Sequence, residues 1–446
     1  MPKDGAISDD VFAQLPRSLQ QLLTFERFHL HRPDKFQNRS RDPDFDPKYF
    51  PQNSGVVQLP CYWIERRHLQ LFGAQATGSG ELGLCFGEGP TGAVLFPIHP
   101  SNFAHYQELL IKLDARDAAK EGLRIWAVPT SSTRTLLAWP DRMPERALFV
   151  KTSLHSAIFG DRRLPAWKVA RSVGLSSLMQ RSGHALPAGL DFFPESFGAG
   201  VRQLPGLGVI VRSIPASIKA NQWSIVPLFA LMGGQHAQPW FLTLMERARL
   251  APLEFVEEVL CAKFARVWLD MSLRQGLILE AHGQDLMLAV KPDLSQIDAF
   301  FYRDFEGLQV DWELRSRRGL LMPSDLPNSC SWHETYASWG CRYGQLVWYK
   351  LRISLLQYLH SVLKELELML RAWQERGLWR GPRLDEDALT AMFSRKIMDL
   401  IQESFGIRVA ADYNIHRNLS RFVLLLLSVR KEVAGRRETT FIAGNR

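Results

Sequence analysis

The stretch Glu280-Ala281-His282-Gly283-Gln284-Asp285 decides the fold, because apolar runs at residues 277–279 and 286–290 flank it on both sides. Short apolar runs around a Gly-containing polar segment predict two β-strands joined by a tight connection. A further apolar run at residues 299–301 leads into Tyr302-Arg303-Asp304-Phe305-Glu306-Gly307. This third strand is expected to bring Asp304 alongside the first connection.

The side chains gathered in this way suit a divalent metal. Mg²⁺ is commonly held by one or two carboxylates, while nucleotide phosphates complete its octahedral shell. We therefore expect Asp304 to bind Mg²⁺ together with Glu280 or Asp285. A turn in which an Asp caps backbone N–H groups fits the same residues, so these segments alone leave both interpretations open.

A second group of polar residues lies upstream. Ser131-Ser132-Thr133-Arg134-Thr135 is followed by Lys151-Thr152-Ser153 and then by Arg162-Arg163. Arg grips phosphate or carboxylate in two parallel bonds, whereas Lys offers a compact charge on a flexible stem. Hydroxyl groups with these cations predict an anion-binding cradle. A solvated basic surface is the alternative for each cation taken alone.

These segments belong to a series of motifs that runs through most of the chain. The series is Leu95-Phe96-Pro97-Ile98-His99-Pro100 with His105 after it, Ser132-Thr133-Arg134-Thr135-Leu136, Lys151-Thr152-Ser153-Leu154 with Arg163 after it, Leu207-Gly208-Val209-Ile210-Val211-Arg212, and the segment from Glu280 to Gln284 with Arg303-Asp304. In this order the motifs resemble those of the NRPS-independent siderophore (NIS) synthetases of the aerobactin-synthetase (IucA/IucC) type. That family comprises ATP-dependent carboxylate–amine ligases.

The resemblance implies an α+β fold with a cupped thumb, fingers and palm, a mixed sheet in the centre and a mostly helical C-terminal part. ATP would lie between fingers and palm. The residues matched to the ATP site are Ser132, Arg134, Thr135, Lys151, Arg163, His282 and Asp304. The resemblance assigns catalysis to His282, Gln284 and Arg163, substrate binding to His99 and His105, and the metal to Asp304 with Glu280 or Asp285.

The implied reaction activates a carboxylate as an acyl-adenylate and releases pyrophosphate, after which an amine or hydroxyl group attacks. The carboxylate would be citrate-like or another polycarboxylate, and the enzyme a homodimer using ATP and Mg²⁺. Two alternatives stay open. A small-molecule phosphotransferase of kinase-like fold also places a His-Gly loop before an Asp-Phe-Glu-like segment, and a shortened chain could be the non-catalytic partner of an active synthetase.

The chain departs from the family pattern in three places. An early segment with two His-Pro pairs and a Lys is not found before residue 95, so a reduced thumb is expected. Ser101-Asn102 stand where the family has Trp-Gln, and Asp285 stands where it has Asn. These differences concern substrate choice more than ATP chemistry.

Composition excludes several other classes. The 446 residues are 46% hydrophobic and carry a formal net charge of +8, but basic and acidic residues are interspersed, so no nucleic-acid partner is expected. The basic cluster at residues 315–318 is expected to be a solvated face. Five cysteines without metal-ligand spacing indicate reduced thiols in the cytoplasm. The start of the chain lacks an apolar signal core, and the run at residues 422–427 is too short to span a bilayer, so no membrane association is expected.

Pro- and Gly-rich breaks and the spacing of apolar residues divide the chain into three parts. Residues 1–95 are expected to form the reduced thumb, 96–235 the fingers with the phosphate-binding loop, and 236–446 the palm with a helical C-terminus. Strands are expected at residues 123–128, 147–151 and 207–212. Helices are expected at residues 11–30, 350–375 and 388–405, where leucines and other apolar residues recur at helical spacing.

Overall fold

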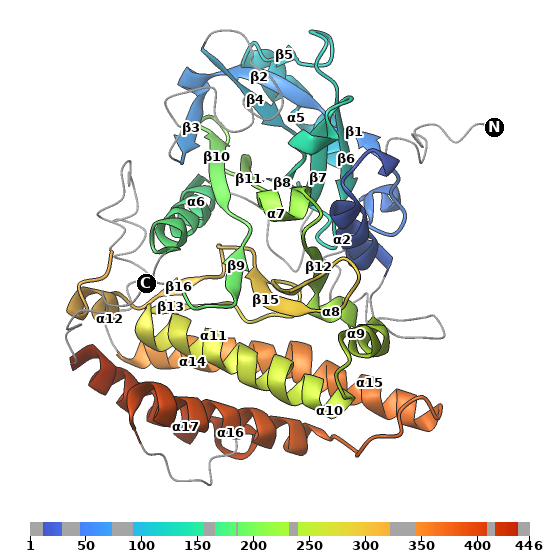
Figure 1. Ribbon diagram of the computed structural model, residues 1–446. Coiled ribbons are helices and arrows are strands. Elements are labelled where there is room, and N and C mark those ends of the chain that lie inside the picture. The colour runs from blue at the N-terminus through green and yellow to red at the C-terminus, as the bar shows by residue number, and fades with distance from the viewer. Residues whose placement is uncertain are drawn as a thin grey trace, which may run out of the picture.

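The computed structural model describes residues 12–28, 45–73, 92–155, 166–183, 186–231, 240–321, 344–407 and 415–435. Within these ranges, strands lie mainly in the first two thirds of the chain and long helices in the last third. Figure 1 shows them stacked as layers, from a small sheet at the top to two long helices at the bottom. The α+β class and the helical C-terminal part are thus confirmed.

The largest sheet has seven strands in the order β1-β6-β7-β8-β11-β10-β3, and every neighbouring pair in it is antiparallel. Its strands are β1 (Val57–Gln58), β3 (Leu69–Phe72), β6 (Ile125–Pro129), β7 (Thr135–Pro140), β8 (Leu148–Thr152), β10 (Glu195–Val201) and β11 (Gly208–Arg212). The three strands expected from the sequence are therefore confirmed as β6, β8 and β11. Both faces of this sheet are covered, which is why β7, β8 and β11 are apolar almost without alternation.

One face of the seven-stranded sheet packs against a three-stranded sheet. That sheet has the order β4-β2-β5, with β2 at Cys61–Glu65, β4 at Ala93–Pro97 and β5 at Arg116–Asp117. Helix α5 (Phe103–Lys112) contributes Tyr106 and Leu110 to the same core. Cys61 in this core and Cys261 in the helical layer are buried free thiols.

The opposite face meets a four-stranded sheet of order β12-β14-β15-β9, in which β9 is parallel to β15. Its strands are β12 (Ser224–Pro227), β14 (Leu286–Val290), β15 (Ile297–Tyr302) and β9 (Leu190–Phe192). Val128 and Leu137 from the large sheet share a core with Met287 and Phe301 from the small one. This mixed sheet is the central layer of the molecule, as expected.

Two helices flank the junction of these sheets, on opposite sides in Figure 1. Helix α2 (Arg17–Phe28) packs along β12, and helix α6 (Ala166–Arg181) packs along β10. Gly198 on β10 makes this second contact possible, because a Cβ there would lie 2.3 Å from Val169 Cγ1.

The remaining face of the four-stranded sheet is covered by helices. The helix from α10 (Pro252–Glu254) through α11 (Phe264–Leu269) and the helix from α14 (Gly344–Tyr358) to α15 (Lys364–Glu375) form the nearer layer. Helices α16 (Glu386–Phe405) and α17 (Ile415–Gly435) pack on the outside of that layer (Figure 1). The helices expected at residues 350–375 and 388–405 are confirmed. Among the described residues, none of the helices is sufficiently long and apolar for a membrane span.

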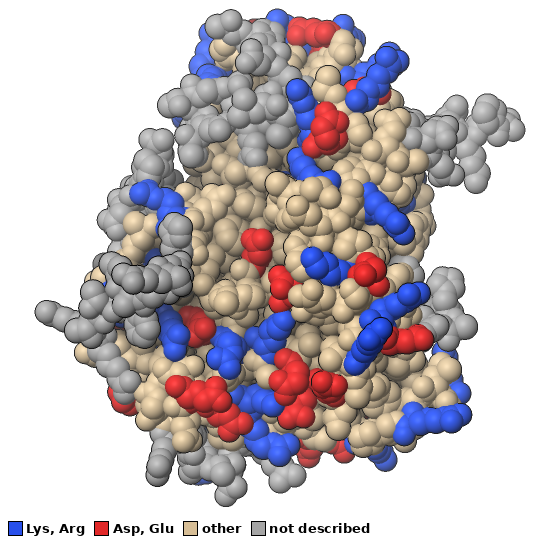
Figure 2. Space-filling model, in the orientation of Figure 1, with Lys and Arg blue, Asp and Glu red and all other residues tan. Residues whose placement is uncertain are grey.

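Charged side chains of both signs are interspersed on the face drawn in Figure 2. The prediction of a solvated face at residues 315–318 is wrong for Arg315, whose side chain is 1% exposed. Its guanidinium donates to the backbone oxygens of Gln275 and Leu321, so it satisfies carbonyls that helix α12 (Trp312–Arg317) and its neighbours would otherwise bury unpaired.

Candidate active site

A cavity of about 330 Å³ lies where the seven-stranded and four-stranded sheets meet. The large sheet and the β6–β7 connection supply one wall, and the connections after β13 (Leu277–Ile278) and β15 supply the other. Its lining residues are Thr130, Ser132, Arg134, Thr135, Arg212, Glu280, His282, Gln284, Asp285, Arg303, Asp304, Glu306 and Gly307. The two segments quoted first from the sequence are thereby brought into one cavity.

The first wall is built on the tight turn between β6 and β7. The Thr135 N–H donates to Ser132 O at 2.9 Å, which closes the turn and places the buried Arg134 side chain at the wall of the cavity. Thr135 lies directly opposite Lys151 in the β7–β8 register, so both side chains point to the same face. Lys151 is 1% exposed, although it is a lysine in mid-strand. A buried lysine requires a compensating partner.

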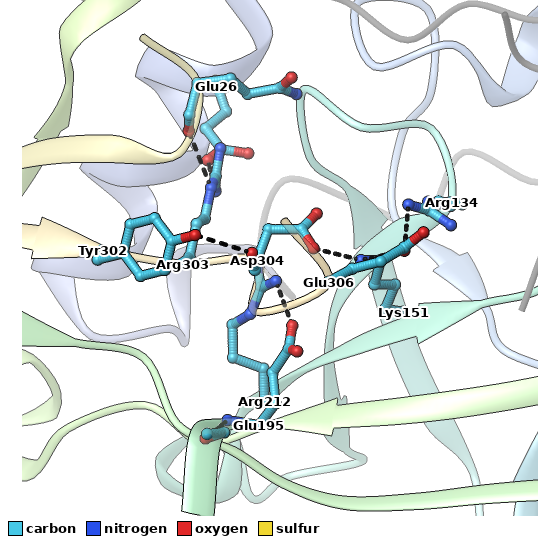
Figure 3. A network of polar contacts seen from close by, with 11 residues as sticks. Glu26, Arg134, Lys151, Glu195, Arg212, Tyr302, Arg303, Asp304 and Glu306 are labelled. Carbon is cyan, nitrogen blue, oxygen red and sulfur yellow. Dashed lines mark hydrogen bonds and ion pairs between the residues drawn. The ribbon is translucent and has the colours of Figure 1, made fainter. Parts of the chain in front are cut away.

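That partner comes from the second wall. Lys151 Nζ lies 2.7 Å from Asp304 Oδ1 and 3.4 Å from Glu306 Oε2. Glu306 also lies 3.5 Å from Arg134 Nη2 and 2.8 Å from Lys168 Nζ. Figure 3 shows Asp304 beside Lys151 and Glu306 beside Arg134. The carboxylates occupy positions close to the groups that an anionic ligand would contact.

Asp304 has a backbone conformation that few side chains accept, with φ at +71°. Asp and Asn tolerate this left-handed region better than other non-glycine residues. The conformation turns the chain sharply after β15, and Tyr302 Oη donates to Asp304 O at 3.2 Å across the turn. It thereby directs the Asp304 carboxylate back toward β8.

Hydrogen bonds also fix the connection that contains His282, Gly283 and Gln284. Ser361 Oγ accepts from the Gly283 N–H at 2.8 Å, and His282 O accepts from the Asp285 N–H at 3.0 Å. His282 Nδ1 accepts from the Gln284 N–H at 3.2 Å, so a neutral His282 carries its proton on Nε2. His282 is therefore a donor at Nε2.

The acids of the cavity have opposed pKa shifts. Burial would raise the pKa of Asp304, but Lys151, Arg212 and Arg134 outweigh burial and hold it well below its usual range. The same competition lowers the pKa of Glu306 to about 2.

The pKa values of the neighbouring carboxylates Asp285 and Glu280 are shifted upward instead. Burial and then the charge of Asp304 raise the pKa of Asp285 well above its usual range, and the same two causes raise the pKa of Glu280. Crowded carboxylates with raised pKa values favour a bound cation, because a divalent ion would offset both burial and repulsion. Across the described ranges, no group of three or more His, Cys, Asp or Glu side chains is placed to hold a metal ion. One or two carboxylates with phosphate oxygens are the arrangement that Mg²⁺ commonly adopts.

The cations also retain unused binding capacity. Arg134 Nη1 is buried and has no hydrogen-bond partner, and the same holds for Arg212 Nε. Arg212 itself is anchored, since its Nη2 lies 2.6 Å from Glu195 Oε1. A phosphate group in this cavity would supply the missing acceptors.

The two residues predicted to bind substrate, His99 and His105, do not line the cavity. Arg163 falls outside the described residues. His105 is exposed on α5, and its ring centroid lies 3.5 Å from that of His155. His99 is fully buried, with Nδ1 2.7 Å from Ser101 Oγ and Nε2 3.1 Å from Thr133 O. Substrate binding by His99 and His105 stays a prediction.

His99 supports the turn between β6 and β7, which carries Arg134. Burial lowers its pKa to about 4, so the ring is neutral at physiological pH. Its Nε2–H then donates to Thr133 O within the turn that carries Arg134. The geometry is that of a positioning residue.

The structure adds residues that the sequence prediction did not include. Glu26 on α2 is fully buried, accepts from the Ser131 N–H at 2.9 Å, and forms an ion pair with Arg303. Arg303 Nε donates to Gln284 O at 3.0 Å, and Gln284 Nε2 donates to Ser131 Oγ at 3.0 Å. Glu26 therefore ties the two walls of the cavity together from a third element (Figure 3).

Gly307 makes room for the carboxylate of Glu280. A Cβ added at Gly307 would lie 1.5 Å from Glu280 Oε2. We expect Gly307→Ala to displace Glu280 and lower turnover about 10²-fold, the scale of effect known for a displacement of about 1 Å in an active site. Steady-state kinetics test this. Gly206→Ala is the control, because no atom lies within 4 Å of its added Cβ. Normal turnover in Gly307→Ala would contradict a role for the Glu280 position.

Comparison with known proteins supports the fold. No protein-family profile matches the chain, and no curated protein matches its sequence. Solved structures do match. The petrobactin biosynthesis protein AsbB from Bacillus anthracis str. Sterne gives a TM-score of 0.63 at 15% identity over 89% of this chain and 68% of its own. Aerobactin synthetase IucC from a hypervirulent pathotype of Klebsiella pneumoniae gives a TM-score of 0.65 at 16% identity, over 90% of this chain and 72% of its own. The chain has the siderophore-synthetase fold.

An ATP-bound aerobactin synthetase IucA from the same pathotype gives a TM-score of 0.54 at 17% identity over 86% of this chain and 73% of its own. The fold that the ordered motifs implied is therefore confirmed. Within the siderophore-synthetase fold, the domain boundaries at residues 95 and 235 stay a prediction.

Proposed function

We propose that this protein is an ATP-dependent, AMP-forming ligase that joins a citrate-like polycarboxylate to an amine or hydroxyl group, as in siderophore biosynthesis. The observation that carries the proposal is the cavity in which Arg134 and Thr135 face Asp304 and His282, with Lys151 Nζ 2.7 Å from Asp304 Oδ1. Cations with unused donors beside crowded carboxylates suit a triphosphate and its metal. The ATP-bound neighbour of the same fold supports this assignment.

Each residue has a defined part in the proposed reaction. Ser132, Arg134, Thr135 and Lys151 would hold the phosphates, together with Arg163. His282, with its donor at Nε2, would bond the oxygen of the adenylate phosphate, and Gln284 would fix the turn that presents it. Arg212 adds a fixed positive charge. Since the carboxylate and the triphosphate repel one another, this density of fixed cations lowers the barrier to their approach.

The proposed reaction proceeds in two steps. A carboxylate oxygen of the acid attacks the α-phosphorus of ATP, the bond from that phosphorus to the bridging oxygen breaks, and pyrophosphate leaves. The acceptor nitrogen or oxygen then attacks the acyl carbon, the bond from that carbon to the adenylate oxygen breaks, and AMP leaves. The acceptor loses one proton to solvent.

Mg²⁺ would be held by Asp304 with Asp285 or Glu280. Asp285 is the better second ligand, because Glu280 Oε1 already accepts from Gln357 Nε2 at 2.8 Å and its other oxygen packs on Gly307. Bound there, the ion would neutralise charge on the departing pyrophosphate.

Asp304→Asn is expected to lower Mg²⁺-dependent turnover by about 10² or more, as removal of one preorganised charge-stabilising group does in other active sites. Asn tolerates the left-handed backbone at this position, so the fold should persist. Turnover measured against Mg²⁺ concentration, with a thermal melt as folding control, tests the prediction. Wild-type turnover would place the metal elsewhere.

The nucleotide product decides the reaction class. The protein is incubated with Mg-ATP, a panel of citrate, 2-oxoglutarate and succinate, and a mixture of diamines and amino alcohols. AMP and pyrophosphate that appear only with a carboxylate support the ligase. ADP would favour the phosphotransferase alternative, and ATP binding without turnover would favour a non-catalytic partner.

The family resemblance also implies a homodimer, and light scattering tests it. The five cysteines, which show no metal-ligand spacing, support a cytoplasmic location with reduced thiols. We expect small-molecule substrates, with neither a nucleic acid nor a membrane as partner.

A further inference from the structure

Helix α14 and the π-helical turn η9 (Leu359–Leu363) that follows it carry a polar stripe among apolar residues. Ser354, Gln357 and Ser361 form this stripe at positions i, i+3 and i+7, the spacing of one helix face. Ser354 and Ser361 are each 2% exposed. Buried hydroxyl groups have hydrogen-bond partners in folded proteins, and the partners show which part of the molecule the stripe holds.

Two members of the stripe hold the start of the connection between β13 and β14. Ser354 Oγ donates to Leu279 O at 2.6 Å. The same oxygen accepts from Trp268 Nε1 of α11 at 2.9 Å, so the serine is fixed from both sides. Gln357 Nε2 donates to Glu280 Oε1 at 2.8 Å. The helix therefore holds this connection by side-chain hydrogen bonds, beyond the end of the β13 ladder at Ile278.

The third member, Ser361, holds the connection further along. Its Oγ accepts from the Gly283 N–H at 2.8 Å and donates its proton to Gln357 O at 2.6 Å. The second bond fixes the hydroxyl group, so that a lone pair faces Gly283. The backbones also approach closely, because a Cβ added at Gly283 would lie 2.9 Å from Ser361 O. Ser361 lies in the π turn, where the Lys364 N–H donates to Leu359 O, and such turns occur frequently at functional sites.

The peptide held by Ser361 is the one that joins His282 to Gly283. Gly283 O accepts from the Phe229 N–H at 3.1 Å, so both backbone polar groups of Gly283 are fixed. His282 lines the cavity, and its Nδ1 accepts from the Gln284 N–H at 3.2 Å. Ser361 does not line that cavity. A rotation of the peptide between His282 and Gly283 would thus require loss of the Ser361 bond and would move the imidazole.

We propose that Ser361 is a positioning residue for carboxylate activation, which fixes the Gly283 peptide and thereby the direction in which His282 offers its Nε2 proton to the adenylate phosphate. The inference rests on the proposed function. Ser361 touches neither the nucleotide nor the acid and acts through His282. Arg134 and Lys151 lie on the opposite wall of the site, so their contacts with ATP do not depend on Ser361.

Ser361→Ala removes the acceptor of the Gly283 N–H and leaves the lining of the cavity unchanged. Activation is measured as exchange of labelled pyrophosphate into ATP that depends on citrate, 2-oxoglutarate or succinate. The exchange kcat should fall at least about tenfold, because a displacement of about 1 Å at an active site costs up to about 10². The dissociation constant for ATP, measured by calorimetry, should stay within about twofold of the wild-type value.

A double-mutant cycle shows whether Ser361 acts through His282. The probe is the acyl sulfamate of adenosine made with the acid that supports exchange, in which sulfonyl oxygens stand for the adenylate phosphate oxygens. Ser361→Ala and His282→Ala should each raise its dissociation constant at least about tenfold, and the double variant should bind it as His282→Ala does. A residue that only supports the fold would instead give additive losses.

Ser272→Ala is the matched control. Ser272 also lies in a π-helical turn, η7 (Asp270–Arg274), and is 2% exposed, but within the described part of the chain its Oγ has no hydrogen-bond partner. Its exchange rate and its affinity for the acyl sulfamate should match those of the wild type. Ser361→Cys replaces Ser361→Ala if a thermal melt shows that the alanine variant is unfolded, because sulfur fills the site and is only a weak acceptor.

The outcomes separate this inference from the proposed function. If the wild type shows no acid-dependent exchange, or does not bind the acyl sulfamate, the proposed function is overturned. Exchange in Ser361→Ala within about threefold of the wild-type rate would overturn the positioning inference alone. Equal weakening by Ser361→Ala with and without His282 would do the same, as would unfolding of both variants at residue 361, because the serine would then serve the fold.

Discussion

Glu26→Ala is expected to lower the free energy of unfolding by about 3–5 kcal/mol, the usual effect of removing one partner of a buried ion pair. The substitution leaves the Arg303 guanidinium buried, with 7% of its side chain exposed, and the Ser131 N–H without its acceptor. Alanine is an excellent helix former, so the loss cannot come from the helix itself. Urea unfolding followed by circular dichroism measures the change.

Two further variants identify the cause. Arg17→Ala, at an exposed position on the same helix, should change stability by less than about 0.5 kcal/mol. The double variant Glu26→Leu with Arg303→Met removes both charges and should recover most of the loss, because apolar residues often replace a buried pair without penalty. A change below about 1 kcal/mol in Glu26→Ala would show that the ion pair is not required for folding.

The position of Glu26 was within reach of sequence analysis, but its partner was not. Leu15, Leu19, Leu22 and Glu26 recur at helical spacing, so Glu26 lies on the apolar stripe of α2, and the structure buries all four. A charge on such a stripe requires a buried partner. Nothing in the spacing could identify Arg303, because the two residues are 277 positions apart.

The connection at residues 280–285 could be predicted because it depends on the apolar runs directly before and after it in the sequence. Apolar runs fixed β14 and β15, their antiparallel pairing follows from short connections, and the pairing places Leu286 opposite Tyr302. Asp285 and Asp304 then emerge at the same edge of the sheet. The strand predictions for β6, β8 and β11 rested on the same kind of local pattern.

Contacts between layers could not be predicted in the same way. Gln357 reaches Glu280 from α14, and Ser361 reaches the Gly283 N–H from the following π-helical turn. Periodicity marked these helices as core-forming and so gave no reason to place their polar residues at a site. A cavity of about 250 Å³ between α6 and α14 depends on this packing, so local sequence patterns could not indicate it.

Lys151→Met is expected to weaken the binding of ATP and to strengthen the binding of Mg²⁺ alone. Methionine keeps most of the apolar volume and removes the charge, so ATP loses charge-assisted hydrogen bonds worth about 1.5–3 kcal/mol. The dissociation constant for ATP should therefore rise about ten- to 150-fold. In the absence of nucleotide, Asp304 and Glu306 lose the cation that neutralises them at 2.7 and 3.4 Å, so Mg²⁺ alone should bind more tightly.

Calorimetric titrations with ATP and with Mg²⁺ alone measure both dissociation constants and so test both changes. Lys48→Met is the matched control, because Lys48 Nζ also lies 2.7 Å from a carboxylate, Asp46 Oδ2, but its side chain is 64% exposed. Exposed pairs contribute little, so neither titration should change in the control. If Lys151 were only a structural partner of Asp304, the variant would bind Mg²⁺ more tightly while its ATP affinity stayed at the wild-type value. Opposite shifts in one variant require that the same ammonium group serve the carboxylate in the empty cavity and the phosphate in the filled one.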